Sequence, residues 1–400
     1  MSTHESHWAL RFAAGWYVAA AASVFLGFIG CSGNEGNAGS AGHAGNEVGA
    51  GGTGGGTGGS GGGSTSSGGM GGGIVSSSSS SSSSSGMTNP ADPCDFPAMN
   101  TVEVADTNAL KDALAAATPG TKIHLADGTY SGQFAVAPGT NGTEANPIII
   151  CGSRQAILDQ GGTNGYTFHL EADWWILSGF TIARGQKSVM LDGANHNLIT
   201  GLELRDAGME IIHFRCSSAD NTLQDSEIHG SGKADDGSAG LAEGIYIGTN
   251  TGVCAKTNDD DKSDRNRILR NNVYDIYSEC IDAKEGTLNG EIRGNTFDGN
   301  LINGANSADS WVDVKGVGYV IANNIGKNSG GNGLLTAGFQ THFHTLAGSG
   351  SDNTFSGNTS DVVIDTFGID ITNQTTGNVV KCDNVFPGAK NGNTNIMCTN

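Results

Sequence analysis

The amino-acid sequence predicts an all-β solenoid, a fold in which short strands coil and each coil stacks on the previous one. Short apolar segments recur along the chain, each followed by a Gly/Asn turn, as in NGEIRGNTF and GYVIANNIG. The asparagines assigned to these turns are Asn272, Asn295, Asn324, Asn358 and Asn384, at steps of 23, 29, 34 and 26 residues. A repeat of this length in strand-forming sequence is typical of a β-solenoid, and unequal steps predict loops of unequal length on one side.

The first 90 residues are expected to lie outside the folded domain. Residues 1–30 contain the apolar run AAGWYVAAAASVFLGFIG without stop-transfer charges after it, which predicts a secretory signal. The run ends in FIGC, which resembles a bacterial lipobox, so Cys31 is the expected lipidation site and the outer membrane the expected anchor; a plain secreted signal is the alternative. Residues 31–90 are rich in Gly and Ser and predict a disordered tether that reaches about 40 Å.

The cysteines predict an oxidising compartment outside the cytoplasm, because eight of them follow a signal sequence. Lipidation of Cys31 would leave an odd number for the folded domain. Proximity in the sequence suggests three disulfides and a free Cys280: Cys94–Cys151, Cys216–Cys254 and Cys382–Cys398.

Residues 91–400 form the expected solenoid domain, and its open first coil needs a cap. The segment TNALKDALAAATPG (107–120) predicts a short amphipathic helix with Asp106 or Thr107 as the N-cap and Gly120 after its end. This helix would cover the apolar end of the first coil.

A second series of strands interleaves with the repeat: SVMLDG, EIIHFR, EGIYIGT, ECIDAKE, SWVDVKG, GFQTHFH and FGIDITN. Strand alternation places these residues inward: Ile245, Ile247, Ile281, Ala283, Val312, Val314, Phe343, Ile369 and Ile371. The outward residues form one column of His213, Tyr246, Asp282, Asp313, His342 and Asp370, and a second of Arg215, Gly248, Lys284, Lys315, His344 and Thr372. A slip that puts Gln340 in the place of His342 is an open alternative. Because parallel strands stack about 4.8 Å apart, the DAK and DVK segments should form one patch of two lysines and two aspartates.

The amino-terminal part of the domain adds a family resemblance. The run from TNALKDALAAATPG through LADGTY and ANPIII to ILDQGG is similar to the signature of right-handed parallel β-helix polysaccharide lyases of the chondroitinase B and alginate lyase family. The likeness covers residues 100–300 and implies a right-handed parallel β-helix with a cap helix. It also implies a general-base lysine, an acidic Ca²⁺ ligand five residues before it, and an assisting arginine on the next coil. Lys284 and Glu279 match that spacing, whereas Tyr277 replaces a second acidic ligand and Lys315 replaces the arginine.

β-Elimination on a uronic acid removes the proton α to a carboxylate, so the site must neutralise that carboxylate, supply a base and stabilise an enolate-like anion. Lys284, Lys315 and His342 are the candidate catalytic residues, and Lys315 is expected to lower the pKa of Lys284 by like-charge repulsion. Glu279, Asp282 and Asp313 are the candidate Ca²⁺ ligands. The candidate substrate-binding residues are Arg215, Tyr246, His344 and Trp311. A net charge of −20 would repel a polyanionic substrate, which makes local cations necessary.

Other interpretations remain open. The Asp/Lys pattern also fits an ion-pair ladder, His342 and His344 fit plain surface histidines, and Trp311 fits packing between coils. A non-catalytic, lipid-tethered protein that binds glycans or acts as an adhesin is the alternative function, and a C5-epimerase shares the elimination half-reaction. The acidic chain has no basic stripe, which argues against nucleic-acid binding, and a monomer is expected.

Overall fold

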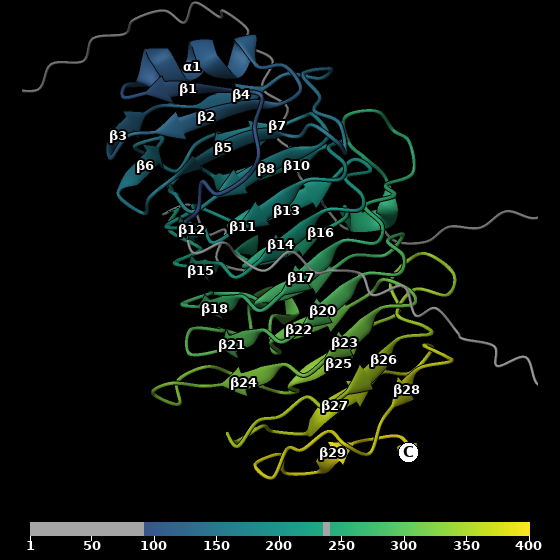
Figure 1. The fold of residues 1–400 in the computed structure, drawn as a ribbon. Coiled ribbons are helices and arrows are strands. Elements are labelled where there is room, and N and C mark those ends of the chain that lie inside the picture. Colours follow the sequence, from purple (N-terminus) through teal and green to yellow (C-terminus); the bar gives the residue numbers. More distant parts are fainter. Residues whose placement is uncertain (1–91, 235–240) are drawn as a thin grey trace, which may run out of the picture. The chain divides into compact units, whose positions relative to one another are not determined.

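The structure is a computed structural model that describes residues 92–234 and 241–400 (Figure 1). The predicted signal segment, Cys31 and the Gly/Ser tether lie outside the described residues, so they stay predictions. Within the described ranges, no helix is long and apolar enough to cross a membrane.

Three parallel sheets, each made of strands from successive coils, form the predicted parallel β-helix (Figure 1). Sheet A contains β1 (Asn100–Val104), β2 (Thr121–Leu125), β5 (Ile148–Gly152), β8 (Trp175–Ser178), β11 (Leu198–Thr200), β14 (Thr222–Gln224), β17 (Arg267–Leu269), β20 (Glu291–Arg293), β23 (Val320–Ala322), β26 (Thr354–Ser356) and β28 (Val379–Val380). Sheet B contains β3 (Gly128–Ser131), β6 (Ala156–Asp159), β9 (Thr181–Ala183), β12 (Glu203–Arg205), β15 (Glu227–His229), β18 (Asn272–Tyr274), β21 (Thr296–Asp298) and β24 (Ile325–Lys327). Sheet C contains β4 (Phe134–Val136), β7 (Tyr166–Leu170), β10 (Lys187–Asp192), β13 (Ile212–Arg215), β16 (Ile245–Ile247), β19 (Ile281–Ala283), β22 (Val312–Val314), β25 (Phe339–Thr341), β27 (Phe367–Ile371) and β29 (Gly392–Thr394).

The core lies inside the coils, where apolar side chains from the three sheets meet. Of the residues predicted to point inward, only Phe343 is wrong, because β25 ends at Thr341 and Phe343 falls in the following loop with 37% of its surface exposed. Phe339 and Thr341 occupy the inward positions of this coil and are fully buried. The alternation of inward and outward residues cannot reveal this error, because a shift of the strand by two residues leaves every side chain on the same face of the sheet.

A ladder of buried asparagines holds one bend of successive coils, but its first predicted member is wrong. Asn271, not Asn272, occupies the ladder: its backbone N–H donates to Asn295 Oδ1 at 2.8 Å, and its side-chain amide donates to the Leu223 carbonyl at 3.0 Å. Asn272 begins β18 and its side chain is exposed. The same pattern continues through Asn324, Asn358 and Asn384. These amides satisfy buried backbone groups that no sheet ladder can reach.

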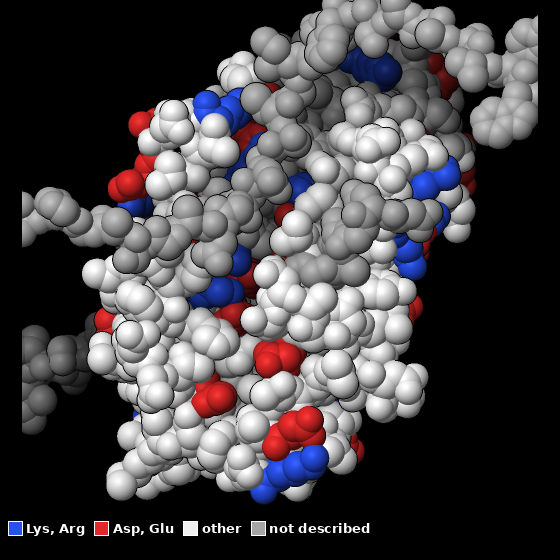
Figure 2. All heavy atoms as spheres, turned by 180° about the vertical axis from the view of Figure 1, so that it is seen from behind, with Lys and Arg blue, Asp and Glu red and all other residues white. Residues whose placement is uncertain are grey.

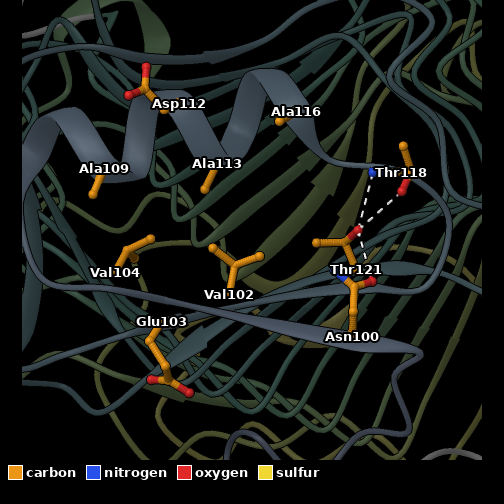
Figure 3. Close-up of a pocket in the computed structure, with 10 residues that line it drawn as sticks. All are labelled: Asn100, Val102, Glu103, Val104, Ala109, Asp112, Ala113, Ala116, Thr118 and Thr121. Carbon is orange, nitrogen blue, oxygen red and sulfur yellow. Dashed lines mark hydrogen bonds between the residues drawn. The ribbon is translucent and has the colours of Figure 1, made fainter.

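Helix α1 (Thr107–Ala116) confirms the predicted cap, and Asp106 is its N-cap. The Asp106 carboxylate accepts hydrogen bonds from the backbone N–H groups of Asn108 and Ala109, and Leu110 and Leu114 are buried against the first coil. The helix ends earlier than the predicted position before Gly120. A groove of about 360 Å³ lies between α1 and β1, and five of its ten lining residues have small apolar side chains (Figure 3). It contains none of the predicted site residues.

The disulfide predictions are confirmed. Cys94–Cys151, Cys216–Cys254 and Cys382–Cys398 are bonded, and Cys280 is free and buried. Several disulfides in one chain indicate a location outside the cytoplasm.

Candidate functional site

The outward face of sheet C brings most of the predicted site residues together. β16, β19 and β22 are neighbouring strands, and Tyr246, Asp282 and Asp313 lie directly beside one another on them. Lys284 and Lys315 follow β19 and β22 at the next outward positions. The register of the DAK and DVK segments is therefore as predicted.

Two lysines and two aspartates form a compact cluster on this face. Lys284 Nζ lies 2.8 Å from Asp282 Oδ2, and Lys315 Nζ lies 2.9 Å from Asp282 Oδ1 and 2.5 Å from Asp313 Oδ2. Asp282 therefore bridges the two ammonium groups. Each lysine side chain is only 12% exposed, so these pairs are screened little by water.

The carboxylates reverse the expected effect on the lysines. Burial lowers the pKa of Lys284, but the charge and hydrogen bond of Asp282 outweigh burial and leave that pKa above its ordinary value. Burial likewise lowers the pKa of Lys315, and Asp282 and Asp313 raise it more than Lys284 lowers it. The prediction that Lys315 would depress the pKa of Lys284 is thus wrong, because the intervening Asp282 was left out of the charge balance. The raised pKa values favour the ammonium form of both side chains.

His342 contacts the cluster, but it does not occupy the position beside Asp313 where the outward column placed it. Gln340, not His342, lies beside Asp313 in the strand register, so the alternative with a slip is the correct one. His342 follows β25 on the next outward position, and its Nδ1 lies 2.9 Å from Asp313 Oδ1. Burial lowers the pKa of His342, but the hydrogen bond and charge of Asp313 raise it above the ordinary value. His342 therefore caps the Asp313 end of the cluster.

Two predicted substrate-binding residues lie elsewhere. Trp311 is fully buried in the core, and its indole N–H donates to the Lys327 carbonyl at 2.8 Å. Gly326 and Gly338 leave the space for its ring, since a Cβ at either position would lie within 2.8 Å of it. His344 lies in the loop after β25, where its Nδ1 is 2.6 Å from the buried Glu285 carboxylate.

A group of buried carboxyls borders the lysine cluster. Oxygens of Glu243, Glu279 and Asp282 lie within 4.8 Å of one another, and each residue is at most 5% exposed. Glu279 and Asp282 were predicted as metal ligands, whereas Asp313 is not in this group and pairs with Lys315 and His342 instead. Glu243 was missed. The signal for it was available, because Glu243 and Glu279 both stand three residues before an outward position on their strands.

The two glutamates of this group are perturbed towards the neutral acid. Burial, followed by the charges of Glu210 and Asp282, raises the pKa of Glu243 to about 8. Burial, followed by the charges of Asp282 and Glu243, raises the pKa of Glu279 well above its ordinary value. Glu243 Oε2 is buried and has no hydrogen-bond partner among the described residues. Three carboxylates with one unsatisfied oxygen are a donor set suited to a hard divalent cation.

Tyr246 lies beside the lysines. Lys284 Nζ is 4.9 Å from the centroid of the Tyr246 ring, and the His213 ring packs against the other side at 4.5 Å between centroids. Burial, followed by the charge of Asp282, raises the pKa of the Tyr246 phenol well above its ordinary value. The phenol therefore keeps its proton and can donate it.

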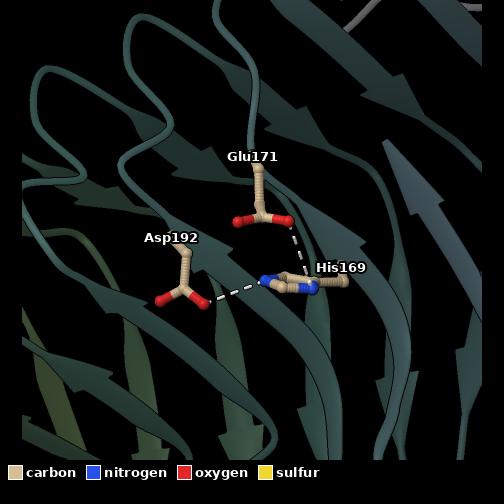
Figure 4. Close-up of side chains that lie close together, drawn as sticks. All are labelled: His169, Glu171 and Asp192. Atoms are coloured by element: carbon tan, nitrogen blue, oxygen red, sulfur yellow. Dashed lines mark hydrogen bonds and ion pairs between the residues drawn. The ribbon is translucent and has the colours of Figure 1, made fainter. Parts of the chain in front are cut away.

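A second polar cluster lies further towards the amino-terminal end of sheet C. His169 stands between two carboxylates: its Nε2 is 2.9 Å from Asp192 Oδ2, and its Nδ1 is 3.8 Å from Glu171 Oε2 (Figure 4). Arg215, a predicted substrate-binding residue, donates to both oxygens of Asp192 at 2.6 and 3.1 Å. Lys256 forms an ion pair with Glu171. Seen from behind, the molecule carries Lys and Arg side chains beside Asp and Glu side chains along a recessed strip (Figure 2).

Comparison with known proteins shows what the chain as a whole is similar to. Residues 167–313 match the family model described as the right handed beta helix region. The crystal structure of an alginate lyase from Paenibacillus sp. str. FPU-7 is 35% identical, covers 75% of this chain and 99% of its own, and superposes with a TM-score of 0.68. The crystal structure of pectate lyase Pel9A shares the fold, with 14% identity, coverage of 74% of this chain and 79% of its own, and a TM-score of 0.50. No curated protein sequence matches the chain significantly.

Proposed function

This chain belongs to the right-handed parallel β-helix family of polysaccharide lyases, and from that premise we propose that it cleaves a uronate-containing polysaccharide by β-elimination. The observation that carries the proposal is the cluster of Lys284, Lys315 and Tyr246 on the outward face of sheet C, in a chain that aligns with 99% of an alginate lyase. An alginate-type polyuronate is the first substrate to test. Surface charges without a function are normally exposed to water, whereas the charged groups of this cluster are nearly buried.

The residues divide the tasks of the elimination. The Lys315 ammonium would pair with the substrate carboxylate, which makes the α-proton more acidic. Lys284 would take that proton, and Tyr246 would donate one to the leaving glycosidic oxygen. Because Asp282 holds the pKa of Lys284 above its ordinary value, little of Lys284 is neutral at pH 7. The rate should therefore rise with pH on the alkaline side, and kcat/KM measured from pH 6 to pH 10 checks this.

Calcium fits the buried carboxyl group and is part of the proposal. Glu243, Glu279 and Asp282 would hold the ion, since all three offer carboxylate oxygens and Glu243 Oε2 lacks any other partner among the described residues. When bound, the ion would supply positive charge against the substrate carboxylate. Release of the ion should reprotonate the two glutamates, whose pKa values are raised.

The deciding experiment incubates the purified chain with alginate, pectate, chondroitin sulfate and dermatan sulfate, and follows the ultraviolet absorbance of the unsaturated product. Parallel reactions contain Ca²⁺ or a chelator. Lys284→Met should abolish product formation, and Lys262→Met, at an exposed lysine of the 248–266 loop, should not. A folded wild-type protein that forms no unsaturated product on any of these polymers would favour the alternative, a non-catalytic glycan-binding protein or adhesin.

The cellular setting extends the proposal. We propose that residues 1–30 direct export, that Cys31 carries a lipid anchor in the outer membrane, and that residues 31–90 tether the catalytic domain. Mass spectrometry of the mature protein would reveal acylation at Cys31, and an unmodified amino terminus at another residue would contradict it.

A further inference from the structure

The second polar cluster lies on the same outward face of sheet C as the proposed catalytic lysines, but several strands away. Arg215 ends β13, two strands from β19 and Lys284, and Asp192 ends β10, one strand further. Parallel strands lie about 4.8 Å apart, so these groups are roughly 10 to 14 Å from Lys284 along the helix axis. A 1,4-linked pyranose unit advances by about the same step as one strand. A glycan lying along this face would therefore meet the second cluster two or three sugars away from the cleaved bond.

The loop between β16 and β17 (248–266) brings a lysine to this place from another coil. Cys254 of the loop is disulfide-bonded to Cys216, the residue after Arg215. The buried Asp261 carboxylate accepts hydrogen bonds from the backbone N–H groups of Cys216 at 3.0 Å and Ser217 at 2.9 Å. These contacts hold the loop against the end of β13. As a result, Lys256 pairs with Glu171 and lies 4.0 Å from Asp192.

The cluster keeps cationic donors available. Arg215 uses its Nε and one terminal nitrogen on Asp192, and no described residue accepts from its Nη1. Lys256 makes its ion pair with Glu171 while 49% of its side chain stays exposed. The two carboxylates of the cluster are balanced by the charges of Arg215 and Lys256. An incoming anion therefore meets no local excess of negative charge, although the net charge of the whole chain is −20.

We propose that Arg215 and Lys256 form a carboxylate-binding subsite for a uronate unit two to three sugars from the cleaved bond. The inference rests on the proposed lyase function and names a specificity device for it. An enzyme with this subsite prefers chains long enough to reach from Lys284 to Lys256. The disulfide-anchored loop is part of the subsite, because it places Lys256 beside Glu171 and Asp192.

The test measures kcat/KM on oligomannuronates from trimer to octamer by the absorbance of the unsaturated product. Lys256→Met removes one partly exposed, charge-assisted contact, and we expect the ratio of the octamer to the trimer value to fall about tenfold, mainly through KM. Lys262→Met is the matched control: it lies in the same loop, is 52% exposed and pairs with Asp260 of its own loop. Its ratio should equal that of the wild type. A Cys216→Ser, Cys254→Ser double variant should lower the ratio as Lys256→Met does.

Two results would overturn the subsite. One is an unchanged length dependence in Lys256→Met; the other is an equal loss on trimer and octamer, which indicates a structural role. If the wild type cleaves no uronate, the lyase proposal fails and binding tests the subsite separately. In affinity electrophoresis through alginate at low salt, Lys256→Met should then migrate faster than Lys262→Met, and equal mobilities would remove the subsite as well.

Discussion

Replacing Glu243 with glutamine should stabilise the folded protein at pH 8 and change it little near pH 5. Burial and neighbouring carboxylates raise the pKa of Glu243 to about 8 in the folded state, against roughly 4.3 for an unfolded glutamate. Between these values the folded state holds a proton that the unfolded state has released. Stability therefore falls as pH rises through this window, with the opposite sign to a salt-bridged carboxylate. Glutamine resembles the protonated acid and does not titrate in either state.

The size of the effect follows from the two pKa values. Each pKa unit corresponds to about 1.4 kcal/mol, so the penalty carried by Glu243 grows by on the order of 3 kcal/mol between pH 5 and pH 8. The residue is 3% exposed, so water screens little of this cost. The full penalty should appear only without a divalent cation, because an ion bound to Glu243 and Glu279 would favour the ionised forms.

The assay is urea unfolding of the wild type and Glu243→Gln at pH 5 and pH 8, in buffer with chelator. The difference in unfolding free energy between the two proteins should be small at pH 5, about 1 kcal/mol because the unfolded glutamate is already mostly ionised there, and should favour the variant by on the order of 3 kcal/mol more at pH 8. Glu144→Gln, in an exposed loop, is the control and should change stability by less than about 0.5 kcal/mol at both pH values. If the difference in unfolding free energy between Glu243→Gln and the wild type is the same at pH 5 and pH 8, the assignment of a neutral, buried Glu243 is refuted.

Two further predictions concern stability. Asn271→Ala removes the acceptor of the buried Ser226 N–H and a donor to the Leu223 carbonyl, so it should cost on the order of 2–4 kcal/mol in urea unfolding, whereas exposed Asn272→Ala should cost almost nothing; equal effects would contradict the ladder assignment. Burial raises the pKa of Asp192, but hydrogen bonds from His169 and Arg215 lower it below its ordinary value. Its stabilisation is complete above about pH 4 and is lost as pH falls further, so the stability deficit of Asp192→Asn should shrink in acid.

The fold was predictable because a solenoid repeats its signals. Asparagines at bends, apolar residues at alternate positions and a capped helix before the first coil all indicate the same architecture, and the structure confirms them. What failed were choices between similar candidates. Asn271 and Asn272 are neighbours in RNNVY, and only Asn271 stands three residues after a fully buried isoleucine, as Asn295 and Asn324 do in their coils. Phe343 and Phe339 share one parity, so the end of β25 rather than the pattern fixes which is buried.

The site was predictable where strand register alone decides it. Tyr246, Asp282 and Asp313 align as the outward column required. Glu243 was missed although it stands in the same position relative to its strand as Glu279, and its burial depends on how the coils stack. The direction of the Lys284 pKa shift was predicted wrongly for a related reason. Two neighbouring lysines alone would lower the pKa, but Asp282, which both lysines share, raises it. Side-chain electrostatics of this kind depend on distances that a sequence does not contain.

The remaining choice is between a catalytic cluster and an ion-pair ladder that only supports the sheet. A ladder would match each buried carboxylate with a cation, as Lys315 matches Asp313. Glu243 and Glu279 break that rule, because no described Lys, Arg or His forms an ion pair with them and their pKa values are raised. Two unpaired buried acids beside two paired lysines lower stability at neutral pH, which selection for stability alone would remove. Perturbed groups of this kind cluster at functional sites. The unpaired glutamates, more than the ordered ion pairs, are therefore what favours a working site on sheet C.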